Sequence, residues 1–109
     1  MHLRIFILLT FLGVVHVYAS EQVTGLVVSS LEQREDDEEA PFDIHSSNKI
    51  HNCGGKPSNV YRVYSEFDTV AQRRFMLALE ALKSRMTLSV WTDGCDGRVL
   101  RVNSLRLDK

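Results

Sequence analysis

The residues best suited to chemistry in this sequence are two cysteines and the histidines near one of them. Cys53 follows His51 by two positions, and Cys95 lies far along the chain among turn residues. In an oxidising compartment two such cysteines are expected to form a disulfide. The alternatives are a zinc site, to which His45 would add a ligand, and a nucleophilic Cys53 activated by His51. We favour the disulfide, because structural zinc sites usually contain paired ligands at short spacing and Cys95 stands alone.

Three aromatic residues form a second candidate site. Tyr61, Tyr64 and Trp91 could line a face on which sugars or bases stack. The alternative is that they cover the protein's own core or an interface with a partner. No Ser-His-Asp set can be assembled, because neither His45 nor His51 lies in a motif. We therefore expect no catalytic residue, no cofactor and no metal site, although a small hydrolase using one of these histidines stays an alternative.

Charge is concentrated in one short segment. Residues 35–39 are all acidic, while the formal net charge of the whole chain is only −1. Consecutive carboxylates are not spaced as a cation-coordination loop requires, so we interpret this run as a solvated loop between strands. A near-neutral net charge also gives no reason to expect a nucleic acid as a partner.

The N-terminal segment predicts export. Arg4 precedes an apolar run over 5–17, and Val17-Tyr18-Ala19 has the small-x-small pattern that a signal peptidase recognises. The alternative, an uncleaved anchor, would need about 20 apolar residues. We predict a signal peptide over 1–19 and a secreted or periplasmic protein, without stable membrane insertion after cleavage. The remaining residues, 20–109, suffice for a single domain and are too few for a dinucleotide-binding fold or an α/β barrel.

Hydrophobic periodicity in the remaining chain predicts a mainly β protein with one helix. The apolar stripe of the helix repeats every three or four residues; it comprises Ala71, Phe75, Ala78, Leu79, Leu82 and Met86. Ser65 or Asp68 is expected to cap its N-terminus. Five strands are expected, three before this helix and two after it; they cover 22–31, 42–45, 60–65, 87–92 and 98–107.

Two irregularities within strands and one turn between strands are expected. In the first strand, Val23, Val27 and Leu31 should share one face, and Gly25 on that face suggests a bend. Residues 93–97 contain two Asp-Gly steps and predict a turn before the last strand. The apolar positions of the last strand change phase near 103–104, as a β-bulge would cause.

The order of three strands, one helix and two strands is that of the OB-fold, a five-stranded Greek-key barrel. Several segments also resemble small exported OB-type domains, namely the B subunits of AB-type toxins in the subtilase-cytotoxin and pertussis-like group, and short uncharacterised secreted bacterial proteins. These segments are Gln22-Val23-Thr24-Gly25, Cys53 before strand 60–65, the helical run 77–82, the strand 88–91 and Gly94-Cys95. The resemblance implies an OB-like barrel with Cys53 bridged to Cys95.

These observations predict an exported, non-catalytic binding module whose ligand is a glycan or a protein partner. The toxin subunits that this chain resembles bind sialylated glycans, but no motif in this chain matches their pocket, so no binding residue is carried over. A homo-oligomer is implied by the resemblance alone. The alternative is a small secreted inhibitor or structural protein that docks on an exported enzyme, with the acidic run 35–39 as a contact.

Overall fold

A computed structural model describes residues 21–34 and 41–109 of the chain. The predicted signal peptide over 1–19 and the acidic run over 35–39 lie outside the described residues. Within the described residues, five strands and one α-helix are present, so the prediction of a mainly β protein with one helix is confirmed. None of the helices in this part of the chain is long and apolar enough to cross a membrane.

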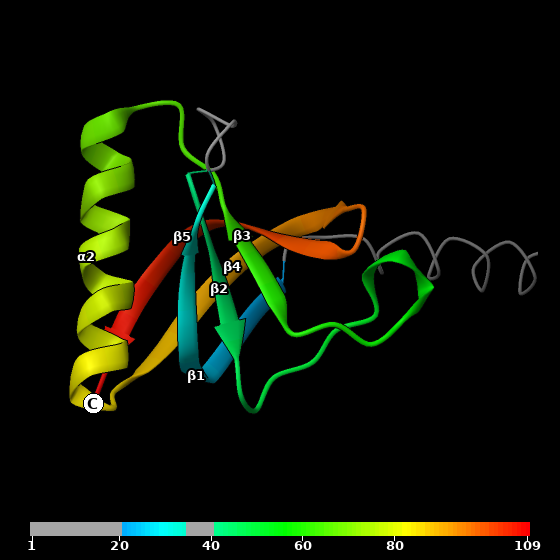
Figure 1. Cartoon of the computed structure of the whole chain (residues 1–109), viewed down its shortest axis with the longest axis horizontal. Coiled ribbons are helices and arrows are strands. Elements are labelled where there is room, and N and C mark those ends of the chain that lie inside the picture. The colour runs from blue at the N-terminus through cyan, green and yellow to red at the C-terminus, as the bar shows by residue number, and fades with distance from the viewer. Residues whose placement is uncertain (1–20, 35–40) are drawn as a thin grey trace, which may run out of the picture.

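The strands form a closed barrel in the order β1-β2-β3-β5-β4, in which β4 pairs with β1. Along the chain the elements are β1 (Glu21–Gln33), β2 (Phe42–Ser46), the 3-10 turn η2 (Cys53–Gly55), β3 (Val60–Val63), α2 (Asp68–Ser84), β4 (Thr87–Asp96) and β5 (Val99–Asp108). Neighbouring strands are antiparallel except β3 and β5, which run parallel. The helix stands at one side of the barrel, and η2 and the tip of the β4–β5 hairpin lie at the other (Figure 1).

The first strand bends, and the bend changes which residues face the core. Gly25 has φ +66°, and the β1–β4 register shifts between Val23 and Leu26. The bend suggested by Gly25 is thus confirmed. The prediction that Val27 shares the buried face is wrong, because the shift turns Leu26 and Val28 inward and leaves Val27 38% exposed.

The β4–β5 hairpin is longer than predicted. Asp93 and Gly94 lie inside β4, where the register between the two strands shifts, and the turn itself occupies 97–98. The first Asp-Gly step therefore forms an irregularity within a strand and not the predicted turn. The predicted bulge in the last strand is confirmed, because Trp91 pairs with Ser104 and Thr92 with Val102, leaving Asn103 unpaired.

The helix packs on the barrel through small residues. Ala78 and Ala81 are buried, and Leu82 packs against the same core cluster. The predicted caps are wrong, because Phe67 occupies the N-cap position without a side-chain bond. Ser65 Oγ instead accepts the Phe67 N–H at 3.2 Å, just before the helix. The helix also ends before the predicted Met86.

Candidate ligand-binding surfaces

The predicted disulfide is confirmed. Cys53 in η2 is bonded to Cys95 in β4, with the two Cα atoms 5.5 Å apart. Because the two sulfur atoms are bonded to each other, neither is a free thiolate for zinc or for nucleophilic attack. The bridge joins the loop that follows β2 to the β4–β5 hairpin, two regions far apart in sequence.

His51 is engaged with the backbone on both sides of its ring. Its Nδ1 accepts the Cys53 N–H at 3.2 Å, so its Nε2 carries the proton and donates to the Val60 carbonyl at 2.7 Å. The ring also packs edge-to-face on Tyr61, with centroids 5.1 Å apart. These contacts assign His51 a structural role in shaping the loop around the disulfide. His45 lies elsewhere and pairs with Glu32 on the neighbouring strand, 3.0 Å away.

The three aromatic residues proposed as a stacking face do not form one. Tyr61 points into the barrel and is 1% exposed, and this burial raises the pKa of its hydroxyl. The prediction that it lines a surface face is therefore wrong, because strand alternation places Tyr61 inward together with Val63. Tyr64 and Trp91 remain half-buried at the outside of the barrel, on opposite sides of β5.

Each of the two remaining aromatic rings is paired with an arginine of β5. The Arg101 guanidinium lies 4.0 Å from the centroid of the Tyr64 ring, and that of Arg106 lies 5.6 Å from the Trp91 ring. Five residues along a strand span roughly 16 Å, so the two pairs are separate features. The Tyr64 hydroxyl also donates to Asp96. Burial first, and then this hydrogen bond, raise the pKa of Tyr64.

Polar side chains near Tyr64 form a network in which the groups satisfy one another. Asp93 accepts hydrogen bonds from Arg101 and from Asn103, each at 3.2 Å. On the next strands, Arg62 makes a two-pronged ion pair with the buried carboxylate of Asp43, at 2.8 and 3.1 Å. That hydrogen-bonded pairing raises the pKa of Arg62. We call these residues of β2, β3, β4 and β5, together with Tyr64, the outer-face network.

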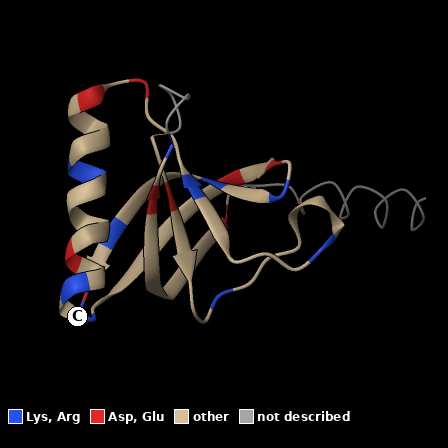
Figure 2. Ribbon diagram, viewed as in Figure 1, with Lys and Arg blue, Asp and Glu red and all other residues tan. Residues whose placement is uncertain are grey.

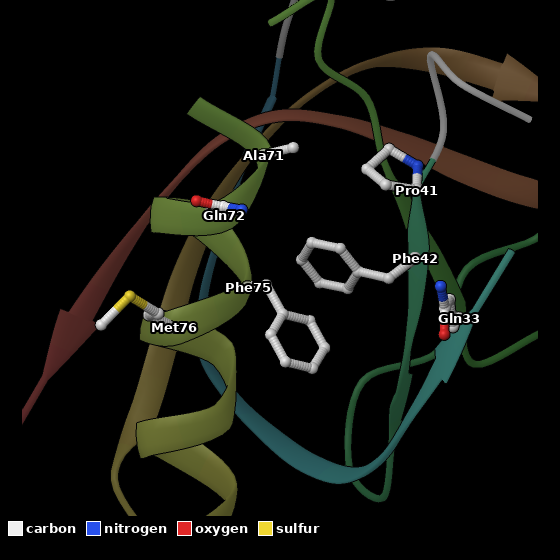
Figure 3. A pocket seen from close by; sticks show the side chains of 7 residues that line it. All are labelled: Gln33, Pro41, Phe42, Ala71, Gln72, Phe75 and Met76. Carbon is white, nitrogen blue, oxygen red and sulfur yellow. The ribbon is translucent and has the colours of Figure 1, made fainter. Parts of the chain in front are cut away.

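A groove between the helix and the barrel has the opposite character. It has a volume of about 450 Å³ and lies where the end of β1 and the start of β2 face the first half of α2 (Figure 3). Among the residues that the structure describes, the groove is lined by uncharged side chains, namely those of Gln33, Pro41, Phe42, Ala71, Gln72, Phe75 and Met76. We call this feature the groove.

Two phenylalanine rings form the wall of the groove. Phe42 of β2 and Phe75 of α2 meet edge-to-face, with centroids 5.2 Å apart and ring planes at 89° (Figure 3). Phe42 is buried, whereas Phe75 is 36% and Met76 67% exposed. Apolar surface thus remains open to solvent beside a closed core. The sequence placed Phe75 on the apolar stripe of the helix, but nothing in it showed that Phe42 would lie opposite.

Comparisons with known proteins leave the family open: no protein-family model matches this chain, and no curated protein matches it.

Proposed function

We propose that this protein is an exported, non-catalytic binding module built on an OB-like Greek-key barrel. The strand order β1-β2-β3-β5-β4, closed by pairing of β4 with β1, supports the OB-like assignment, as does the position of α2 between β3 and β4. The disulfide supports export, since such bonds persist in oxidising compartments.

The ligand we propose is a protein segment that inserts an apolar side chain into the groove. The observation that carries this proposal is the uncharged lining beside the exposed faces of Phe75 and Met76. A charged group entering this groove would lose its hydration and would find no charged partner among the described lining residues, which disfavours a charged anchor. Phenylalanine and methionine are enriched at protein interfaces, and methionine adapts its shape to different partners.

The groove also contains groups that can bind a peptide backbone. Gln33 at the end of β1 and Gln72 on α2 each offer an amide donor and an amide acceptor. An extended segment could therefore bury one apolar side chain against Phe75 and exchange backbone hydrogen bonds with these amides. The same arrangement would serve an inhibitor docking on an exported enzyme, in which case the enzyme supplies the segment.

A peptide library displayed on phage, selected on the full chain after removal of its leader, tests this proposal. We expect enrichment of peptides with an aromatic or branched aliphatic anchor and no charge beside it. Phe75→Ala should weaken the selected peptides at least tenfold. Phe67→Ala is the matched control, because Phe67 is also an exposed phenylalanine, 65% accessible, but does not line the groove. Equal affinity for the wild type and Phe75→Ala would overturn the proposal.

A glycan is the second candidate ligand, favoured by the exposed polar groups near Tyr64. Asn103 bonds to Asp93, and Asp93 is linked through Arg101 to the partly exposed Tyr64 ring; exposed amide and carboxylate groups of this kind suit sugar hydroxyls. A glycan array probed with the wild type and with Asn103→Ala distinguishes this alternative. Binding lost in Asn103→Ala and kept in Phe75→Ala would favour the glycan over the peptide.

A further inference from the structure

The side of α2 that faces away from the barrel carries an alternating charge pattern. Asp68, Arg73, Glu80 and Lys83 are exposed, and acidic and basic bands follow one another along the helix (Figure 2). Within the described residues none of these four takes part in an ion pair. Glu80 does accept a hydrogen bond from the Ser84 hydroxyl. Met76 lies between the charges and is 67% exposed.

The four charged residues are arranged symmetrically around Met76, with an acidic residue opposite each basic one. A helix turns by roughly 100° per residue, which puts Arg73 and Glu80 on one side of Met76 and Asp68 and Lys83 on the other. On each side, the acidic and the basic residue lie at nearly equal distances from Met76 along the axis, in opposite directions. Reversing the helix therefore exchanges acidic for basic residues on both sides.

We propose that α2 packs antiparallel against α2 of a second copy of this chain, about a two-fold axis close to Met76. In that arrangement Arg73 of each copy faces Glu80 of the other, and Asp68 faces Lys83. Met76 meets its own equivalent at the centre. A two-fold interface requires one surface patch to be complementary to itself, and this charge pattern has that property.

The position of the helix allows this contact. α2 stands at the side of the barrel, so its outward face is free of other described elements (Figure 1). A helix of 17 residues is about 25 Å long. A contact of that length buries less surface than a standard stable interface, so the dimer should be weak and should dissociate in the micromolar range or above.

Charge-reversal variants, studied alone and as mixtures, test this arrangement. Dimerisation of residues 20–109 is measured by sedimentation velocity over a series of protein concentrations. We expect the wild type to dimerise, and R73E and E80R each to weaken the dimer about tenfold, because each places like charges opposite one another. The double variant R73E/E80R should restore it. A mixture of R73E with E80R should form heterodimers, since each variant then faces the charge it needs. Lys56→Glu, an exposed reversal in the loop after η2, is the control and should leave the dimer unchanged.

Two outcomes would overturn the inference. The first is a wild type that stays monomeric at about 1 mM. The second is a dimer that R73E and E80R leave intact, or that mixing them fails to restore, because the contact would then lie elsewhere. Met76 belongs both to the groove and to this contact, so the two proposals share one residue. Phe75→Ala keeps Met76 and all four charges, and the charge variants keep the groove lining, so loss of peptide binding in the former and loss of dimerisation in the latter are separate results.

Discussion

The outer-face network and the groove use aromatic residues in opposite ways. At the outer face, the Tyr64 hydroxyl is bound by Asp96, its ring is covered by Arg101, and Arg101 is itself bound by Asp93. In the groove, Phe75 has one aromatic partner among the described residues and keeps a third of its surface exposed. A group whose partners lie within its own chain stabilises the fold, whereas apolar surface without a cover is available to a ligand.

Neighbouring residues of one short strand supply both regions. Phe42 points inward to the groove and Asp43 points outward to Arg62, because side chains alternate along β2. The two regions therefore share a backbone but differ in what their side chains do. Changes confined to one of them should leave the other unaffected. Loss of the disulfide and the Tyr64→Phe variant test this separation directly, and two further experiments measure what the buried polar groups contribute to the fold.

Loss of the disulfide should have the largest effect. It closes a loop between residues 42 positions apart, and its removal should lower the free energy of unfolding by roughly 4 kcal/mol. Hydrogen exchange after reduction should accelerate in 47–59 and in the hairpin that carries Asp93 and Asp96. Amides of α2 and β2 around the groove should change little. An equal acceleration in both regions would contradict the separation.

Asp43→Asn should have the next largest effect. The Asp43 side chain is 4% exposed and that of Arg62 15%, so the variant leaves a mostly buried guanidinium without its counter-charge. We expect a loss of about 3 kcal/mol in urea denaturation. Glu32→Gln is the control, because its pair with His45 is exposed and should contribute less than about 1 kcal/mol. Similar losses for the two variants would show that burial of the Asp43 pair is unimportant.

Alkaline pH should destabilise the fold through Tyr61. Burial raises the pKa of Tyr61 above the usual tyrosine value of about 10, so the folded state keeps its proton when the unfolded state has lost it. Unfolded chains then bind fewer protons, and stability falls as the pH rises from about 10 through the higher pKa of the folded state. Tyrosinate absorbance and denaturation at increasing pH measure this. Tyr61→Phe should remove part of the dependence, and an unchanged pH profile in that variant would assign it to another group.

Tyr64→Phe should have the smallest effect. It removes one hydroxyl that donates to the exposed Asp96, and such a bond contributes about 0.5 kcal/mol. Peptide binding in the groove should be unaffected. A loss above about 2 kcal/mol would indicate that the outer-face network acts as a cooperative unit and not as separate contacts.

The sequence predicted the elements well where the pattern was local and regular. The helix and the strands come from hydrophobic periodicity, and Gly25 and Asn103 each marked an irregularity that the structure contains. Errors arose where an irregularity changed the phase, as at Val27, or where a turn signal lay inside a strand, as at Asp93. The local residues allowed Val27 to lie on either face of its strand and Asp93 to lie in a turn or in a strand. In both places the pairing with the neighbouring strand decided the outcome.

The residues by themselves determined the mainly β composition, the single helix and the pairing of Cys53 with Cys95, because these depend on local periodicity and on there being only two cysteines. Only the tertiary structure decided which aromatic residues are exposed. It placed Tyr61 in the core and set Phe42 of β2 against Phe75 of α2, residues 33 positions apart in the sequence. The hydrophobic periodicity of the sequence cannot predict this contact, because it depends on how the helix packs against strands from distant parts of the chain.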